Sequence, residues 1–280
     1  MKNRDYKRFY LNWKWYYYVL VLFLILYMFI LSIKYGIIQE GWYMNNKNEV
    51  NVLILSYDAM NSFFTTHVNF ITAIWLIVII LQYDQIKPSD RWVRIFTNIV
   101  LNYNLIMLVG FIIGLIFNKP EIANQLVSLE NWTTYQAVVT IVIHFIIPLA
   151  LVVIYFFEQK TYYYQFKKIR SYWSELLLVN IYPCIYLGFI LTRSIVYKNA
   201  NIEQYRFAYG FLNFEKPLIG SSSIGYFILL SLFVILSITL TQLIVMFYNN
   251  LCFNIKNKYF NSDFKNSKDE IYDDKQVINN

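Results

Sequence analysis

Six long apolar segments, separated by polar connections, set the strongest limit on what this chain can fold into. Each approaches or exceeds the roughly 20 residues that an α-helix needs to cross a bilayer. The segments lie near residues 15–33, 62–82, 93–117, 135–157, 174–197 and 223–248. Backbone polar groups in hydrocarbon must be satisfied within a helix or a closed barrel, and the segments lack the alternating pattern of a barrel. The sequence therefore predicts an all-α, polytopic membrane bundle of six transmembrane helices.

The composition of the whole chain also indicates an integral membrane protein. Of its 280 residues, 58% are hydrophobic and 15% are charged, and the mean hydropathy is +0.41. The first apolar segment is longer than a signal-peptide core and has no small-residue cleavage site, so we expect it to remain as the first span. The two cysteines, Cys184 and Cys252, lack the paired spacing of a disulfide framework or a zinc site.

The lysines and arginines predict the orientation of the chain. Seventeen lie in the N-terminal segment, the second and fourth connections and the tail, against six in the other connections. Because cytoplasmic loops carry an excess of these residues, we expect both termini in the cytoplasm and the protein in the plasma membrane. The chain then divides into a basic cytoplasmic N-terminus (1–14), a transmembrane domain (15–248) and a polar, disordered cytoplasmic tail (249–280). The net charge of +7 follows from this topology and does not indicate nucleic-acid binding.

Polar side chains within the spans are the candidates for a functional site. No Asp, Glu or Lys lies deep in a predicted span, which disfavours a proton-coupled transporter, and the sequence has no His, Asp and Glu cluster for a metal. In the second span Thr65, Asn69 and Thr72 follow helical spacing and share one face. His67 points to nearly the opposite face, and we expect it at the membrane interface.

The fourth and fifth spans each place a proline close to a polar residue. Pro148 has no N–H to donate to the carbonyl of His144, so we expect a kink in the fourth helix there. An imidazole in an otherwise apolar span must face the bundle interior or a wet cavity. In the fifth span Pro183 precedes Tyr186 and Arg193, which share a helical face, and Arg193 lies near the outer end.

Four segments, in this order, resemble a known family: "FFTTHVNF", "HFIIP", "YPCIYLGFILTR", and "YRFAYGFLNF" followed by "IGYFILL". They are similar to the androgen-induced-gene family of six-helix membrane proteins, and specifically to its bacterial six-transmembrane branch. The resemblance covers most of residues 15–248. It implies an intramembrane hydrolase of fatty acid esters of hydroxy fatty acids, as in the animal members. The implied threonine nucleophile falls on Thr65, with Thr66 as the alternative, and the implied histidine falls on His144. A lineage-restricted membrane family with a similar six-helix pattern is the other interpretation.

Three functions are compatible with these residues. The favoured one is a non-catalytic membrane protein whose polar residues form an interhelical network or a lipid-binding cleft. The first alternative is an acyl-ester hydrolase, in which Thr65 attacks the ester carbonyl and His144 accepts its proton. In that mechanism Asn69 donates to the oxyanion, and Tyr186 or Arg193 holds a lipid carboxylate. The second alternative is a channel or carrier for a small or lipid solute.

The expected partners are membrane lipids. We expect no cofactor, no metal and no nucleic acid. The sequence indicates neither a protein partner nor an oligomeric state.

Two engineered cysteines test the orientation, in a chain whose native cysteines are replaced by alanine. An impermeant thiol reagent applied to intact cells should label Asn46→Cys in the first connection. It should leave Ser267→Cys in the tail unlabelled until the cells are lysed. Labelling of the tail position alone would reverse the orientation.

Overall fold

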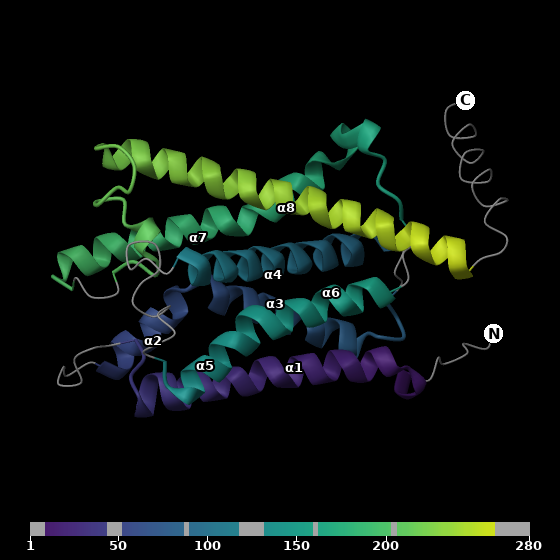
Figure 1. Cartoon of the computed structure of the whole chain (residues 1–280), viewed down its shortest axis with the longest axis horizontal. Coiled ribbons are helices and arrows are strands. Elements are labelled where there is room, and N and C mark those ends of the chain that lie inside the picture. The colour runs from purple at the N-terminus through teal and green to yellow at the C-terminus, as the bar shows by residue number, and fades with distance from the viewer. Residues whose placement is uncertain are drawn as a thin grey trace.

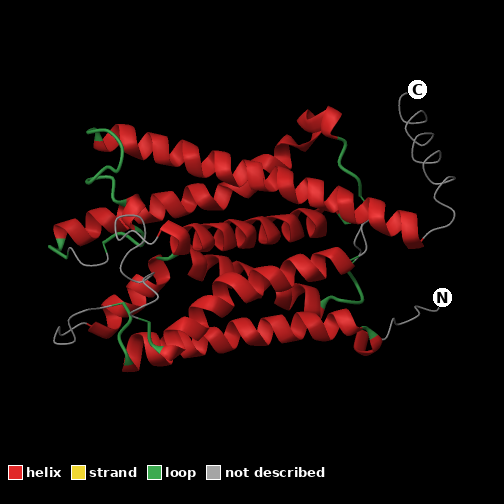
Figure 2. Ribbon diagram, viewed as in Figure 1, coloured by secondary structure: helices red, strands yellow, loops and turns green. Residues whose placement is uncertain are grey.

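Helices make up all the regular structure in the part of the chain that the computed structural model describes, which is residues 9–43, 52–86, 90–117, 132–158, 162–202 and 206–260 (Figure 2). The α-helices are α1 Trp13–Leu31, α2 Val52–Ser62, α3 Phe64–Leu81, α4 Arg91–Phe117, α5 Thr134–Ile141, α6 Ile147–Phe157, α7 Trp173–Asn199 and α8 Ser223–Phe260. Two π-helical segments, η2 Ser32–Gln39 and η5 Val142–Ile146, extend α1 and join α5 to α6. Three 3-10 segments, η1 Phe9–Leu11, η6 Phe166–Tyr172 and η7 Gly210–Leu212, complete the described elements.

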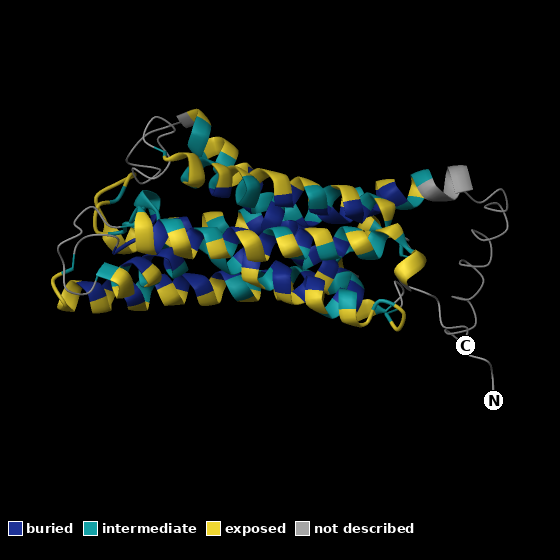
Figure 3. Ribbon diagram, turned by 90° about the horizontal axis from the view of Figure 1, so that it is seen from below, coloured by how far each residue is buried: buried dark blue, intermediate teal, exposed yellow. Residues whose placement is uncertain are grey.

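Six helical segments are long and apolar enough to cross a membrane, which confirms the predicted number of spans. They are Trp13–Gln39, Phe64–Leu81, Arg91–Ile116, Thr134–Phe157, Trp173–Asn199 and Ser223–Ile255. The helices lie side by side, and α1 begins at the same end of the bundle at which α8 ends (Figure 1). Exposed positions lie on the outer faces of the helices and buried positions between them (Figure 3). Many exposed side chains are large and apolar, as a surface in contact with lipid requires.

Two boundaries differ from the sequence-based expectation. The second span begins at Phe64, because Phe63 has an extended backbone (φ −78°, ψ 132°) that separates it from α2. The last helix continues through Phe260, so residues 249–260, which were assigned to a disordered tail, are helical. Asn249 and Asn250 are buried there, because they hydrogen-bond to the segment that follows the fourth span. Residues 1–8 and 261–280 lie outside the described residues.

A π-helical turn, η5, lies just before Pro148, at the position where the sequence predicts a kink. The N–H of Ile147 donates to the carbonyl of Val142, five residues back instead of four. A wider turn of this kind accommodates a residue that disrupts the regular hydrogen-bond ladder, and such turns are frequent at functional sites. His144 lies inside this turn.

Helix α4 lies in the middle of the bundle, where it packs against α3, α6, α7 and α8 (Figure 1). Its buried asparagines join it to its neighbours. Asn102 donates to Oε1 of Gln242 on α8 (3.1 Å), and Asn104 donates to the hydroxyl of Thr72 on α3 (2.8 Å). Hydrogen bonds of this kind between membrane helices contribute about 0.6 kcal/mol on average. The polar core is therefore more extensive than the sequence analysis recognised.

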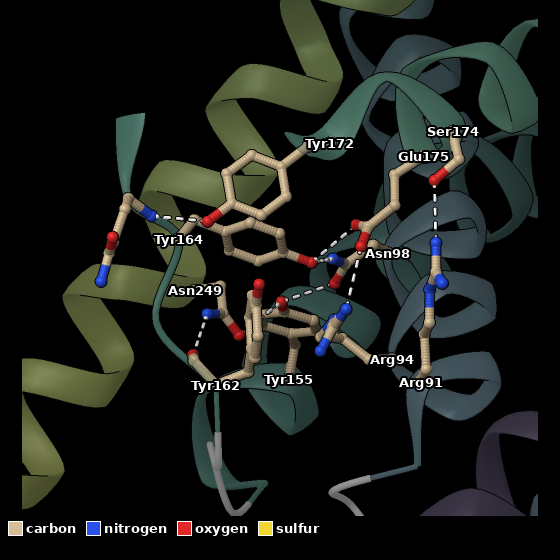
Figure 4. Close-up of polar contacts among 11 residues, drawn as sticks. Arg91, Arg94, Asn98, Tyr155, Tyr162, Tyr164, Tyr172, Ser174, Glu175 and Asn249 are labelled. Carbon is tan, nitrogen blue, oxygen red and sulfur yellow. Dashed lines mark hydrogen bonds and ion pairs between the residues drawn. The ribbon is translucent and has the colours of Figure 1, made fainter. Parts of the chain in front are cut away.

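A buried ion pair between Arg94 and Glu175 (Figure 4) lies where α4 and α7 begin, at the end of the bundle where α1 also begins (Figure 1). Nη2 of Arg94 is 2.9 Å from Oε1 of Glu175, and the two side chains are 13% and 3% exposed. The guanidinium of Arg94 also stacks over the ring of Tyr162, at 3.7 Å from its centroid. The sequence analysis counted Arg94 among the loop charges and did not recognise that Glu175 is buried.

Tyrosines and asparagines connect this ion pair to the core (Figure 4). The hydroxyl of Tyr164 donates to Oε2 of Glu175 (2.9 Å) and accepts from the amide of Asn98 (2.8 Å). The hydroxyl of Tyr155 in turn donates to Oδ1 of Asn98 (2.7 Å). This network joins α4, α6, α7 and the connection between α6 and α7.

Replacement of Glu175 by alanine should destabilise the protein strongly. The change leaves Arg94 buried without its counter-ion, and removal of one partner of a buried pair costs about 3–5 kcal/mol. The measurement is the unfolding free energy from SDS titration of purified protein in mixed micelles.

Arg91→Ala is the matched control. Arg91 lies one turn away on the same helix, and its exposed side chain donates to Ser174. We expect this loss to stay within about 0.5 kcal/mol, as for most surface substitutions. Equal effects of the two substitutions would show that the buried pair does not stabilise the bundle.

Candidate functional site

A cavity of about 140 Å³ lies toward the end of the bundle opposite to the Arg94–Glu175 pair. Thr65, Thr66 and Asn69 from the start of α3 line it, together with His144 from η5. We call it the α3–η5 cavity. The sequence analysis had selected all four of these residues, from two spans far apart in the chain.

Aromatic side chains make up much of the remaining wall of the α3–η5 cavity. Trp42 and Tyr43 come from the segment after η2, Phe111 from α4 and Tyr209 from the connection between α7 and α8. Sequence reasoning missed Trp42, Tyr43 and Tyr209, because these residues belong to connections whose course depends on the folded bundle. The aromatic segment "YRFAYGFLNF" was nevertheless visible as a part of the family resemblance.

Tyr209 occupies the N-terminus of α3. Phe63, the residue before this helix, gives no side-chain cap, so the first N–H groups of α3 have no partner within the helix. Burial raises the pKa of Tyr209 to about 12, against the opposing effect of donors in the side chain and backbone of Thr65 and the backbone of Phe64. The phenol oxygen of Tyr209 therefore lies close to Thr65 at the start of α3.

Thr66 and Asn69, the other two polar residues of α3 that line the cavity, make hydrogen bonds along their own chain segment. The hydroxyl of Thr66 donates to the carbonyl of Met60 (2.8 Å). Asn69 is fully buried, and its amide nitrogen donates to the carbonyl of Thr65 (2.8 Å) and contacts the sulfur of Met107 (3.6 Å). Its carbonyl oxygen Oδ1 is buried and has no hydrogen-bond partner in the described part of the chain.

His144 presents one ring nitrogen as an acceptor. Its Nδ1 lies 2.8 Å from the carbonyl of Thr140, and a carbonyl can only accept. The proton of a neutral ring is therefore on Nδ1, and Nε2 carries the lone pair. The ring stacks against Phe111, with 4.9 Å between centroids. Because its hydrogen bond remains within its own helix, His144 does not join two helices as a polar contact.

His67 does not line the cavity, in agreement with the helical geometry that turns it away from Thr65. The His67 ring packs against α7. Its Nε2 donates to the carbonyl of Asn61 (2.6 Å), and Nδ1 accepts a hydrogen bond from the hydroxyl of Tyr182. The ring also contacts Phe189, so His67 contributes to the packing between α3 and α7.

Tyr186 and Arg193, the two candidates for holding a lipid carboxylate, lie outside the α3–η5 cavity. The hydroxyl of Tyr186 donates to the carbonyl of Ser62 (2.8 Å). Nη2 of Arg193 is 2.7 Å from Oδ2 of Asp58, and Nη1 donates to the carbonyl of Arg206 (2.8 Å). These contacts fix α2 and the α7–α8 connection to α7.

A second buried arginine holds the connection that carries Tyr209. Arg206 donates to the carbonyl of Ser194 (3.0 Å) and pairs with Glu215 (2.6 Å). Hydrogen bonds from Arg206 and Lys198 lower the pKa of Glu215 to about 2. The stabilisation from this depressed pKa is present above the ordinary value near 4.5 and is lost as the pH falls through about 2. The pairing that positions Tyr209 thus persists at all physiological pH values.

Comparisons with known protein families, with curated proteins and with solved structures find no match to this chain. The resemblance of four sequence segments to the androgen-induced-gene family stays a prediction. Among the described residues, no group of three or more His, Cys, Asp and Glu side chains is placed to hold a metal ion.

Proposed function

We propose that this integral membrane protein binds part of a lipid, or of a similar amphipathic molecule, in the α3–η5 cavity. The observation that carries this proposal is that Thr65, Thr66, Asn69 and His144 share one cavity whose other walls are largely aromatic and apolar. Ligand sites in proteins are typically apolar concavities with a small number of well-placed polar groups.

The size of the cavity limits what enters it. A volume of about 140 Å³ is close to that of an engineered cavity of about 150 Å³ that admits benzene. It is smaller than the roughly 300–1,000 Å³ typical of sites for drug-sized ligands. A headgroup fragment or a chain end fits, and the rest of the lipid would lie against the apolar outer surface of the helices.

Hydrolysis of acyl esters is the second candidate function. It is favoured by one specific observation, the tautomer of His144, since an unprotonated Nε2 in the same cavity as Thr65 is what a general base requires. Among the described residues, however, no hydrogen bond joins the Thr65 hydroxyl to His144, whose ring is hydrogen-bonded to the carbonyl of Thr140. General-base catalysis would require that contact to form. Binding without catalysis is therefore the function that the geometry supports best.

Two adjacent valines on α5 provide the test. Val139 is buried and lines the cavity, whereas Val138 is exposed on the outer face of the same helix. Val139→Phe fills the cavity and should reduce lipid binding at least tenfold, while Val138→Phe should leave it unchanged. Binding is measured by native mass spectrometry of detergent-purified protein after incubation with a defined lipid mixture.

Wild-type binding by both variants would rule out the α3–η5 cavity as the site. Fatty acid released from acyl esters during the same incubation would identify the hydrolase, provided that Thr65→Ala and His144→Ala each abolish it. Folding of every variant is checked by size-exclusion chromatography.

A further inference from the structure

Aromatic rings form an unusually large part of the α3–η5 cavity wall. Seven of the 17 described residues that line the cavity are Phe, Tyr or Trp, whereas these residue types make up 20% of the whole chain. Trp and Tyr are common at the level of lipid headgroups, where they anchor a membrane protein in the interface. The rings of this wall line a cavity instead, so anchoring alone does not account for their position.

Four of these rings form a continuous series. Trp42 adjoins Tyr43, with 6.4 Å between ring centroids and planes inclined by 55°. Tyr43 adjoins Phe63 at 6.0 Å and 46°, and Phe63 adjoins Tyr209 at 5.4 Å and 87°. Rings inclined in this way present their faces in different directions, as the walls of an aromatic cage for a quaternary ammonium group do.

Trp42, at one end of this series, is held in place by its own segment. Its backbone N–H donates to the carbonyl of Gly36 (2.8 Å), and its indole N–H donates to Oε2 of Glu40 (2.6 Å). The ring also lies against Gly36, where an added Cβ would come within 2.7 Å of the indole atom Cε3. The ring is therefore positioned before a ligand enters, which lowers the entropic cost of binding.

Glu40 places a negative charge next to the aromatic wall. Its carboxylate accepts hydrogen bonds from two neutral donors, the indole of Trp42 and the hydroxyl of Thr133. An anion bonded to the indole N–H makes the ring more electron-rich, which strengthens the attraction of a cation to its face. The described residues that line the cavity include no Lys or Arg that would repel a cation.

We infer that the α3–η5 cavity binds the quaternary ammonium group of a choline-type lipid headgroup. This inference rests on the proposed function and names the part of the lipid that enters. A trimethylammonium group is similar in size to benzene, which a cavity of comparable volume admits. It carries no N–H, so ring faces can surround it, whereas a primary ammonium brings three donors that need acceptors.

The test compares phosphatidylcholine with three lipids that have the same acyl chains: phosphatidyl-3,3-dimethylbutanol, phosphatidylethanolamine and phosphatidylglycerol. In the dimethylbutyl ester a carbon replaces the quaternary nitrogen, so the shape is kept and the positive charge is lost. Dissociation constants are measured by native mass spectrometry titration of detergent-purified protein. We expect phosphatidylcholine to bind about tenfold more tightly than this carbon isostere, as a desolvated cation–π contact allows, and more tightly than the other two lipids.

Trp42→Leu keeps the wall apolar but removes a ring, so it should abolish the preference for phosphatidylcholine over the isostere. Tyr135→Leu is the control, because Tyr135 is exposed and stacks on Tyr35 outside the cavity, and it should retain the preference. Glu40→Gln keeps an acceptor for the indole and removes the charge. It should weaken the preference, and it provides a second variant in case Trp42→Leu does not fold.

Equal binding of phosphatidylcholine and the isostere by wild-type protein would overturn the inference while the proposed function stands. Loss of the preference in Tyr135→Leu as well as in Trp42→Leu would also overturn it, because the effect would not be specific to the cavity. Binding of none of the four lipids would contradict the proposed function itself. If choline chloride alone then bound, the quaternary ammonium group would remain the ligand and the lipid would not.

Discussion

The requirement that polar groups in hydrocarbon find partners within the protein governs this structure. Water is not available there, so each buried amide or charge either pairs with a neighbouring helix or destabilises the bundle. The central helix α4 meets this requirement with Asn102 against Gln242 and Asn104 against Thr72. Arg94 and Glu175 meet it at the end of the bundle where α4 begins. These contacts fix the helices around α4 and thereby hold the walls of the cavity.

The α3–η5 cavity brings polar side chains of two spans into one site. The π-helical turn before Pro148 places His144 in the wall, and the break at Phe63 leaves the N-terminus of α3 to Tyr209. Oδ1 of Asn69 remains without a donor among the described residues. Because no hydrogen bond joins the Thr65 hydroxyl to His144 among the described residues, binding is favoured over ester hydrolysis.

The spans could be predicted from sequence because long apolar segments have one stable form in a bilayer, a helix. Thr65, Asn69 and His144 were also predictable, since polar residues stand out within such segments. Glu175 and Arg94 were missed because charges near a span end look the same whether they are buried or exposed. Tyr209 was missed because its position depends on the pairing of Arg206 with Glu215, which forms when the connection folds onto α7.

Photo-crosslinking tests the central claim most directly. A long-chain lipid analogue with a diazirine close to its polar end is added to the purified protein, irradiated, and located by peptide mass spectrometry. The structure predicts that modified residues concentrate in segments 60–69 and 136–144, both of which line the α3–η5 cavity, and that excess unlabelled lipid prevents the modification. Modification spread over the exposed apolar faces of α7 and α8, with no competition by unlabelled lipid, would contradict the assignment of a ligand site to this cavity.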